Sequence, residues 1–306
     1  MSNTSSVGIL ESFSRAIQEV AESASPSVVS VSSDGRNGTG IVWDDMGHVV
    51  TAYHVVQGLD EVEIGTSDGE TFTAKVLGRD KASDLALLKT EAKLTPIKRG
   101  DSESLRVGQF VLALANPHAT RASATAGIIT SVKRSIGGWW GVSIEDAVVT
   151  DARLNPGYSG GPLVDASGRM VALSIAYMGS RGIAVPIRKV EAAIERLSTG
   201  KSVGRAYLGI VTHPIPIPED TAKTSEARQD YGLLVLSVEP GSAAKTGGLT
   251  FGDILLSLDG NAVAGYHDLT RLLTEEKVGK ALKLRVLRGG KVVELSVTPS
   301  LAQEAE

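Results

Sequence analysis

The sequence predicts a mainly β protein in which two successive β-barrels are followed by a smaller, separate unit. Short β-branched runs separated by turn residues recur in two series of about six strands between Val28 and Val185. The polar, small-residue stretch Ser198–Gly204 then resembles a linker, and the roughly 100 residues beyond it have a plan of their own. The total of 306 residues suits two or three cores. The expected parts are an N-terminal helical segment at 1–25, a two-barrel domain at 26–200 and a second domain at 205–300.

The N-terminal segment is expected to form a helix from Val7 to Ala24. Its apolar residues recur at spacings of three and four, the period of one helix face: Leu10, Phe13, Ile17 and Val20. Pro26 ends the pattern. Two interpretations stay open, because this face could pack on its own domain or form a contact between subunits of an oligomer.

Strands are expected wherever β-branched runs lie between turn signals such as the sequence D-G-R-N-G. The first series comprises Val28–Val31, Thr39–Trp43, His48–Ala52, Val62–Ile64, Thr71–Leu77 and Leu85–Lys89. The second comprises Phe110–Ala115, Gly127–Val132, Ala147–Thr150, Leu163–Val164, Met170–Ile175 and Ile183–Val185. A helix from Ile187 to about Leu197 follows, with Gly200 as its C-cap.

The unit after the linker mixes strands with helix. The expected order is a strand at Tyr207–Val211, a proline-spaced loop at His213–Asp220, strands at Gly232–Val238 and about Asp253–Leu258, a helix at about Tyr266–Glu275, and closing strands at Ala281–Leu287 and Val292–Val297. The tail after Pro299 is polar and is expected to fray.

Composition excludes several classes of function. A net charge of −4 provides no basic stripe for nucleic acid, and no apolar run approaches the ~20 residues of a membrane span. There is no cysteine, the five histidines are scattered, and Gly38-Thr39-Gly40 lacks the third glycine of a dinucleotide loop, so no metal and no cofactor is expected. A native Met1 without a leader pattern predicts a cytoplasmic protein, whereas a trimmed chain would leave a periplasmic or extracellular location open.

The strongest chemical signal is Asn155–Leu163, reading N-P-G-Y-S-G-G-P-L. Glycines around Ser159 favour a tight turn in which backbone N–H groups can point at a bound oxygen. In acyl transfer the Ser159 hydroxyl would attack a carbonyl, and the N–H groups of Gly157 and Ser159 would hold the oxyanion. A glycine-rich turn with a serine is common, so the hypothesis requires a base and a group that orients the base.

His54 and Asp84 lie upstream of Ser159, in one of the chain orders that the serine triad uses. Taken singly, each has an ordinary interpretation: His54, at the end of an apolar strand, could be structural, and Asp84 could cap the start of one. Together they suit the chemistry, because a neutral imidazole must accept the serine proton while a buried carboxylate fixes its tautomer.

The sequence resembles the HtrA/Deg family of trypsin-like serine proteases that carry a C-terminal PDZ domain. The resemblance is carried by T-A-Y-H-V-V, S-D-L-A-L-L and N-P-G-Y-S-G-G-P-L in that order, followed by Y-L-G-I, E-P-G-S-A-A and G-D-I-L-L. It covers nearly all of the chain from about Ser25 to Pro299. It implies a chymotrypsin-like double β-barrel protease domain and a PDZ domain.

The same resemblance implies roles for particular residues. His54 is the general base, Asp84 orients it and Ser159 is the nucleophile, while Ala152–Tyr158 is the activation loop that forms the oxyanion hole. The implied oxyanion hole comprises Gly157, Tyr158 and Ser159. The implied substrate-binding residues are Ser174, Ile175, Ala176 and Ile183, although Ile183 could equally be ordinary core. The implied PDZ carboxylate loop is Tyr207, Leu208, Gly209 and Ile210.

Two positions depart from the family pattern. Tyr53 precedes the histidine and Tyr158 precedes the serine, where the family usually has Asn. Neither position supplies a triad side chain, so the chemistry is expected to survive while the walls beside the serine differ. The loop Ser32–Gly40 is short, which argues against a regulatory loop that reaches a neighbouring subunit.

These features predict an ATP-independent serine endopeptidase that cleaves unfolded or damaged proteins, with a PDZ domain that binds peptide C-termini. The family implies a homo-oligomer, typically a trimer. The alternative is a peptide-binding chaperone or adaptor with an idle barrel, against which the intact His54, Asp84 and Ser159 count. The walls of the expected pocket offer apolar side chains and no acidic one, so cleavage is expected after small or medium aliphatic residues; Arg153 could instead favour an acidic neighbour.

Overall fold

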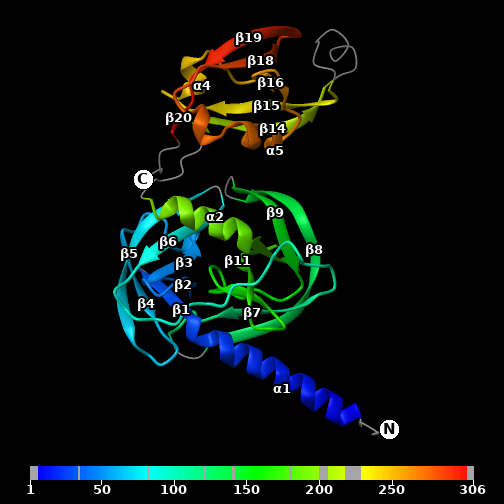
Figure 1. The fold of residues 1–306 in the computed structure, drawn as a ribbon. Helices are drawn as coiled ribbons and strands as arrows, with labels where there is room; N and C mark the ends of the chain where they lie inside the picture. The colour runs from blue at the N-terminus through cyan, green and yellow to red at the C-terminus, as the bar shows by residue number, and fades with distance from the viewer. Residues whose placement is uncertain are drawn as a thin grey trace. The chain divides into compact units, whose positions relative to one another are not determined.

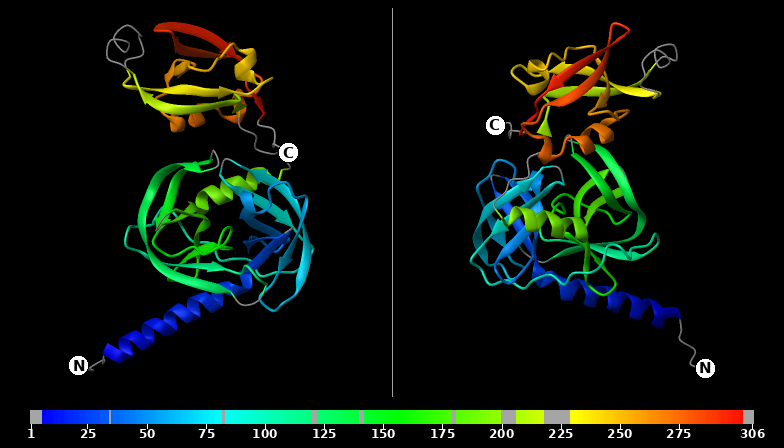
Figure 2. Two further views of the ribbon diagram at one scale, coloured as in Figure 1. Left: turned by 180° about the vertical axis from the view of Figure 1, so that it is seen from behind. Right: turned by 45° about the horizontal axis from the view of Figure 1, so that its top comes forward.

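The computed structural model describes residues 6–33, 35–81, 83–119, 122–139, 142–178, 181–199, 206–217 and 229–301. The chain divides into two compact units, Met1–Val203 and Gly204–Glu306. The first unit contains two closed barrels of six strands each, and the second contains a six-stranded sheet with short helices (Figure 1, Figure 2). The predicted mainly β class, with a double barrel and an N-terminal helix, is therefore confirmed.

The first barrel closes in the order β1-β2-β3-β6-β5-β4. Its strands are β1 (Val28–Ser33), β2 (Arg36–Val42), β3 (His48–Ala52), β4 (Glu61–Gly65), β5 (Thr71–Asp80) and β6 (Leu85–Lys89). The largest fully buried side chains of this barrel are aliphatic and include Ile41, Ile64 and Leu87. The β-branched runs form strands here because closing the barrel buries one side of every strand.

The second barrel closes in the order β10-β11-β12-β9-β8-β7. Its strands are β7 (Phe110–Ala115), β8 (Ser123–Trp139), β9 (Val142–Thr150), β10 (Pro162–Asp165), β11 (Met170–Met178) and β12 (Arg181–Pro186). One cluster of buried residues contains members of both barrels, such as Val50 and Leu173. This shared core packs the two barrels against each other.

Strands β8 and β9 are longer than the sequence predicts. The register between them shifts repeatedly, and Lys133 and Asp146 have positive φ values of 53° and 56°. Such bulges let a strand continue through charged and glycine-rich residues that, taken locally, indicate a turn. The expected ends at Val132 and Ala147 were therefore wrong, since the pairing extends to Trp139 and Val142.

The N-terminal helix α1 (Ser6–Ala24) packs mainly its C-terminal half on the barrels. Ile17, Val20 and Ala21 contact the core, and the Phe13 ring meets the Phe110 ring edge-on at 5.5 Å. The outer half leaves large apolar side chains exposed, namely Ile9, Leu10 and Phe13. Figure 1 shows this half projecting away from the barrels. Packing on its own domain thus accounts for one half of the apolar face.

Helix α2 (Ile187–Leu197) has the predicted bounds and lies across the barrels on its buried face, which includes Val190, Ile194 and Leu197. Leu197 lies so close to β5 that a Cβ built on Gly78 would approach its Cδ2 atom to 2.9 Å. The predicted C-cap, Gly200, lies outside the described residues.

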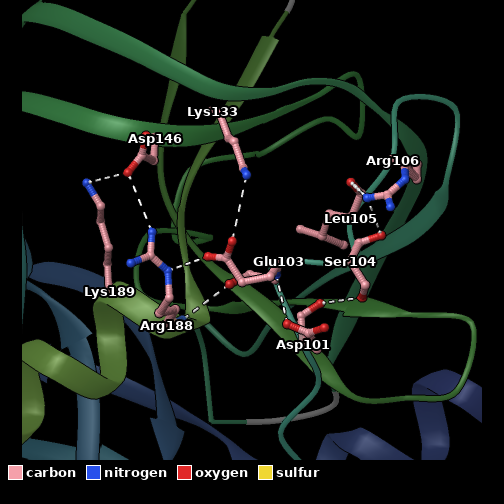
Figure 3. Close-up of polar contacts among 10 residues, drawn as sticks. Asp101, Glu103, Ser104, Leu105, Arg106, Lys133, Asp146, Arg188 and Lys189 are labelled. Carbon is pink, nitrogen blue, oxygen red and sulfur yellow. Dashed lines mark hydrogen bonds and ion pairs between the residues drawn. The ribbon is translucent and has the colours of Figure 1, made fainter.

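Charged side chains surround the start of α2 (Figure 3). Arg188 pairs with Glu103, in the segment between the barrels, and Lys189 Nζ lies 3.3 Å from an Asp146 carboxylate oxygen of β9. Lys133 of β8 approaches Glu103 at 3.7 Å. Most of these side chains are about half exposed, and exposed pairs contribute at most about 1 kcal/mol each. The buried apolar face, rather than this network, therefore holds α2 in place.

The second unit is built on a sheet in the order β14-β15-β16-β18-β19. Its elements are β13 (Ala206–Tyr207), β14 (Ile210–Pro216), β15 (Tyr231–Val238), α4 (Ala243–Thr246), β16 (Ile254–Leu258), β17 (Asn261–Ala262), α5 (Tyr266–Leu272), β18 (Leu282–Arg288), β19 (Lys291–Val297) and β20 (Ser300–Leu301). A separate core that includes Leu233, Leu255 and Leu284 lies beneath the sheet. Among the described residues, no helix is both long and apolar enough to cross a bilayer.

The sequence wrongly predicts how the first strand of this unit runs. The expected single strand Tyr207–Val211 is interrupted at Leu208 and Gly209, and β14 continues through Pro214 and Pro216, where a loop was expected. β14 is the edge strand of its sheet. A proline can occupy an edge strand because its missing N–H can face the side that has no partner strand.

Candidate active site

His54 and Asp84 meet because β3 and β6 are neighbours in the first barrel. His54 lies in the single turn Tyr53–Val55 that follows β3, and Asp84 immediately precedes β6. The two strands pair antiparallel, with Ala52 opposite Leu85. The end of one strand therefore adjoins the start of the other.

Asp84 holds His54 through two hydrogen bonds and the preceding residue, Tyr53, through a third. Its Oδ2 lies 2.7 Å from His54 Nδ1, its Oδ1 accepts the His54 backbone N–H at 3.0 Å, and its carbonyl accepts the Tyr53 N–H at 2.9 Å. Asp84 is 8% exposed and has a φ of 56°, in the left-handed region that Asp tolerates better than most residues. A carboxylate that accepts from Nδ1–H leaves Nε2 of the imidazole as the basic nitrogen. The pair thus has the arrangement that a histidine base would require.

Ser159 lies in the turn between β9 and β10, where most peptide groups are fixed by hydrogen bonds. The Tyr158 N–H donates to the Asn155 carbonyl at 3.0 Å, the Gly160 N–H to the Ser174 carbonyl at 2.7 Å and the Gly161 N–H to the Tyr158 carbonyl at 3.0 Å. The N–H groups of Gly157 and Ser159 have no partner within the described part of the chain. Of the three expected oxyanion-hole residues, Tyr158 thus has its N–H occupied and the other two do not.

Thr39 of β2 connects this turn to the first barrel. Its N–H donates to the Ser159 carbonyl at 2.9 Å, and its Oγ1 donates to the Gly157 carbonyl at 2.7 Å. Its Oγ1 also accepts the Asn116 N–H at 3.1 Å, and its carbonyl accepts the Thr51 hydroxyl at 2.7 Å. Thr39 is completely buried. The Gly157–Tyr158 peptide is therefore held at both ends, by Thr39 and by the Asn155 carbonyl.

The role of Thr39 was missed in the sequence, although a signal was present. Thr39 lies between Gly38 and Gly40, whose Cβ atoms would approach the valine side chains of Val55 and Val49 to 2.7 Å. A glycine on each side of a strand residue marks a close approach of other chain segments. By sequence alone these three residues lie where the short loop Ser32–Gly40 meets the expected strand Thr39–Trp43, and they lack the third glycine of a dinucleotide loop.

The Ser159 hydroxyl is not hydrogen-bonded to His54 in this structure. It donates to the Ile175 carbonyl of β11 at 3.1 Å, and no hydrogen bond joins it to His54 within the described residues. The side chain of His54 is 43% exposed, so its ring remains accessible from solvent. His54 and Asp84 thus belong to the first barrel and Ser159 to the second, where the Ser159 carbonyl accepts the Thr39 N–H of the first barrel. The Asp84–His54 contact is formed, and the His54–Ser159 hydrogen bond is not.

Both tyrosines that depart from the family pattern are buried. Tyr53 is 4% exposed, and Tyr158 is 3% exposed in a core cluster of the second barrel that includes Leu154. Burial raises the pKa of the Tyr158 phenol above its usual value, although hydrogen bonding with Asn155 and Thr125 opposes the shift. Their rings therefore form parts of the cores beneath the site.

The expected substrate-binding residues lie on β11 and β12. Ser174, Ile175 and Ile183 are 1%, 3% and 4% exposed, and the β11–β12 register shifts between Ser174 and Ala176. Ala176 pairs with Ile183, while its side chain is outside the described part of the structure. The Ser174 hydroxyl is buried and has no hydrogen-bond partner among the described residues.

A second candidate site lies in the C-terminal unit, at Tyr207–Ile210. The Leu208 carbonyl accepts the Ala244 N–H at 2.8 Å and the Gly209 carbonyl accepts the Glu239 N–H at 2.9 Å. The N–H groups of Leu208 and Gly209 have no partner within the described residues. Gly209 has a φ of 76°, and a Cβ on it would lie 2.2 Å from the Ser242 Cβ. Only glycine suits this turn.

Tyr207 fixes the start of this loop to Glu239. Its hydroxyl donates to Glu239 Oε1 at 2.8 Å. Burial, together with the hydrogen bond and the charge of Glu239, raises the pKa of Tyr207 to about 12, so the phenol remains a donor at neutral pH. The Glu239 carboxylate thus lies beside the loop that carries the free N–H groups of Leu208 and Gly209.

No cluster of three His, Asp or Glu side chains that could hold a metal ion occurs in the part of the chain that the structure describes.

Comparison with known families assigns both units. Residues 38–173 match the family model described as "Trypsin-like peptidase domain", and residues 218–298 match the model described as "PDZ domain".

Three relatives match most of the chain. "Protease Do-like 1, chloroplastic" of Arabidopsis thaliana is 36% identical over 283 residues, which is 86% of this chain and 63% of that protein. "Probable periplasmic serine endoprotease DegP-like" of Chlamydia trachomatis is 32% identical over 272 residues, 87% of this chain and 54% of that protein. "Putative serine protease HhoA" of Synechocystis sp. is 32% identical over 276 residues, 85% of this chain and 69% of that protein. The chain thus spans between about half and about two thirds of these relatives' lengths.

Solved structures of HtrA-type proteases are also similar to this chain over most of its length. "HtrA-type protease AlgW with tripeptide" is 28% identical with a TM-score of 0.71, and the match covers 94% of this chain and 98% of that one. "HtrA-type protease AlgW with decapeptide" is 25% identical with a TM-score of 0.72, covering 94% and 99%.

Proposed function

Because this chain belongs to the HtrA family of trypsin-like serine proteases, we propose that it is an ATP-independent serine endopeptidase that cleaves unfolded or damaged proteins. The observation that carries the proposal is the closed Asp84–His54 pair, 2.7 Å apart, opposite a serine turn whose two free N–H groups belong to Gly157 and Ser159. These are the groups that acyl transfer requires.

The reaction follows from these positions. The Ser159 hydroxyl leaves the Ile175 carbonyl, donates its proton to Nε2 of His54 and attacks the peptide carbonyl. Asp84 stabilises the imidazolium through Nδ1–H, and the imidazolium then gives its proton to the leaving amine. A water molecule, deprotonated by the same nitrogen, hydrolyses the acyl-enzyme and restores the Ser159 hydroxyl.

The oxyanion would be held by the N–H groups of Gly157 and Ser159. The Tyr158 N–H, which the family resemblance also implied as an oxyanion donor, donates to the Asn155 carbonyl and is therefore not available to the oxyanion. Donors in a fixed peptide framework need no reorganisation as charge develops, which is why such groups contribute about 2.7–4 kcal/mol each to catalysis.

Labelling by a fluorophosphonate probe tests the nucleophile. The wild-type protein should be labelled and should cleave casein, and Ser159→Ala should lose both by several orders of magnitude while keeping its fold. Ser167→Ala, at an exposed serine elsewhere in the same unit, serves as the matched control. Casein cleavage that survives in Ser159→Ala would overturn the assignment.

One observation favours a second candidate, a peptide-binding chaperone or adaptor. The Ser159 hydroxyl is bonded to the Ile175 carbonyl rather than to His54, as would suit an idle site. The same experiment decides between the two, since an adaptor would bind unfolded protein but would leave the probe unreacted.

We propose that cleavage follows small or medium aliphatic residues. Ser174–Ala176 and Gly182–Val185 contain no acidic residue that could pair with Lys or Arg. Ile175 and Ile183 supply apolar side chains in this region. A peptide library should be cut after aliphatic residues, and cutting chiefly after Lys or Arg would refute this pocket. Cutting beside acidic residues would point to Arg153, which is exposed in the activation loop.

For the C-terminal unit we propose binding of peptide C-termini. The free N–H groups of Leu208 and Gly209 precede the edge strand β14, so a carboxylate can bind the turn while the peptide adds to the strand. A peptide with a free carboxylate should bind the full-length protein more tightly than its C-terminal amide. Equal affinities would contradict the proposed site.

Assembly and location are also proposals. The exposed Ile9, Leu10 and Phe13 of α1 would be covered in a homo-oligomer, for which the family suggests a trimer. Sedimentation should show a trimer, and Phe13→Ser should weaken it. Relatives named periplasmic and chloroplastic favour the periplasmic alternative and give no support to the cytoplasmic expectation. Cell fractionation tests the location.

A further inference from the structure

In the C-terminal unit a hydrogen bond joins α5 to the edge strand β14, the two elements between which the proposed peptide groove would lie. The hydroxyl of Tyr266, the first residue of α5, donates to the backbone carbonyl of Thr212 in β14. Thr212 is 6% exposed, whereas Tyr266 is 48% exposed. Figure 1 draws α5 beside β14, and the two elements are in contact. The phenol therefore reaches the backbone of the strand.

The start of α5 is held firmly enough to keep this contact. The Asp268 carboxylate accepts the N–H groups of Ala264 and Gly265, at 2.9 and 3.2 Å, and closes the N-terminus of the helix. The Thr270 hydroxyl donates to the Tyr266 carbonyl at 2.7 Å. Tyr266 thus projects from a capped turn and not from a free loop.

The Thr212 carbonyl is a group that an added peptide strand would use. Within the described residues, β14 has a strand partner, β15, on one side only. A peptide whose carboxylate binds at Leu208 and Gly209 runs antiparallel to β14, because its C-terminus lies at the beginning of that strand. Its N–H groups about two to four residues before the C-terminus then face Thr212. A peptide of two residues is too short to reach it.

We propose that Tyr266 is a latch on the peptide groove: its hydroxyl occupies the Thr212 carbonyl in the free protein and must release it before a longer peptide can pair fully with β14. The inference rests on the proposed binding of C-termini. The latch lowers the affinity for ordinary peptides. It also makes the groove tolerant of proline at the facing position, since Tyr266 keeps the carbonyl satisfied when the ligand has no N–H to offer.

The test uses the full chain carrying Ser159→Ala, so that ligands are not cleaved. Binding of a labelled six-residue peptide with an apolar C-terminal residue is measured for this protein, for Tyr266→Phe and for the control Tyr231→Phe. Tyr231 is similarly exposed, at 51%, and lies at the start of β15. Tyr266→Phe keeps the ring that walls the groove and removes only the hydroxyl. It should tighten binding about fivefold, the value of one hydrogen bond of ordinary strength, while the control stays unchanged.

A backbone-modified series of the same peptide locates the effect. Replacing one peptide N–H at a time by an ester should weaken binding to Tyr266→Phe about fivefold at each position that donates to β14, and only at the position that faces Thr212 should the loss be smaller in the latched protein. A coupling of this kind would not arise if the tyrosine acted only through general stability.

The possible failures are distinguishable. If the carboxylate and amide peptides bind equally, or neither binds, the proposed function of the groove fails and the latch fails with it. If the carboxylate is required but Tyr266→Phe binds like the wild type, the latch alone is wrong. If Tyr231→Phe tightens binding as much as Tyr266→Phe, the gain does not come from Thr212.

Discussion

Replacing Thr39 by valine should remove one of the two hydrogen bonds by which Thr39 holds the nucleophile turn to the first barrel, and should leave only its backbone bond to Ser159. Valine keeps the shape of the side chain and removes the hydroxyl, so the partly buried contact to the Gly157 carbonyl and the buried hydrogen bond from the Asn116 N–H are both lost. Loss of a hydrogen bond at a buried polar group costs about 1–3 kcal/mol, and because the Gly157 contact is only partly buried we expect a total loss of about 2–4 kcal/mol. Thr39→Ser keeps both bonds and loses one methyl group, which costs about 1 kcal/mol.

The effect on catalysis should exceed the effect on binding. The Gly157–Tyr158 peptide would keep only the Asn155 contact, so the neighbouring N–H donors would no longer be fixed. Removal of an oxyanion donor lowers kcat about 10²–10³-fold. We expect Thr39→Val, which loosens the donors without removing them, to lower kcat at least about tenfold and to leave KM little changed. Cleavage of a short reporter peptide, well below the unfolding temperature, measures this.

Tryptophan fluorescence during urea unfolding gives the stability of the first unit alone, because the three tryptophans, Trp43, Trp139 and Trp140, all precede the second unit. Thr90→Val is the matched control, since Thr90 is 3% exposed and its hydroxyl accepts only one long hydrogen bond, at 3.3 Å. If Thr39→Val lost no more stability and activity than Thr39→Ser and Thr90→Val, the hydrogen bonds of the Thr39 hydroxyl would not fix the nucleophile turn, and this prediction would be refuted.

Three further changes have definite expected outcomes. Asp84→Asn should lower kcat about 10⁴-fold with the fold intact, because an amide would favour the wrong tautomer of His54; a loss below tenfold would argue against the triad. Arg288→Leu should destabilise the second unit by about 1–3 kcal/mol, a range discounted because the arginine is partly exposed, and hydrogen exchange in β18 measures it. Burial alone would raise the pKa of Asp253, but hydrogen bonds from Arg288 and Thr250 lower it. The stabilisation is therefore complete above the unfolded pKa of about 3.9 and is lost as the pH falls further, and the variant should show a smaller acid-dependent loss because only the Thr250 hydrogen bonds remain. Glu239→Gln should tighten binding of carboxylate peptides about twofold at low salt and not at high salt, as titrations at two ionic strengths would show.

Much of the fold can be read from the sequence, because its signals are local. The bounds of α2 and the ends of most strands follow from side-chain period and turn residues within a few positions. The triad candidates are also local signals, since His54 ends one strand, Asp84 precedes another and Ser159 lies among glycines. Their order in the chain and the motifs around them were enough to identify the family.

The failures share a cause. The lengths of β8 and β9 depend on bulges that only the paired strand makes favourable. Prolines in β14 are tolerated only because that strand has one free edge, and edge position is a property of the whole sheet. Local composition indicates a turn between β8 and β9 where the strands in fact continue, and a loop at the prolines of β14.

The sequence by itself determined the family, the strand series and the identity of the reactive groups, because these depend on residue type and short-range spacing. Only the tertiary structure decided which N–H groups stay free at Gly157 and Ser159, and that Tyr266 occupies the Thr212 carbonyl. Thr39 and Gly157, which share a hydrogen bond, are 118 positions apart in the chain. Whether a backbone group is free or occupied depends on such distant partners, and no local pattern of side chains contains that information.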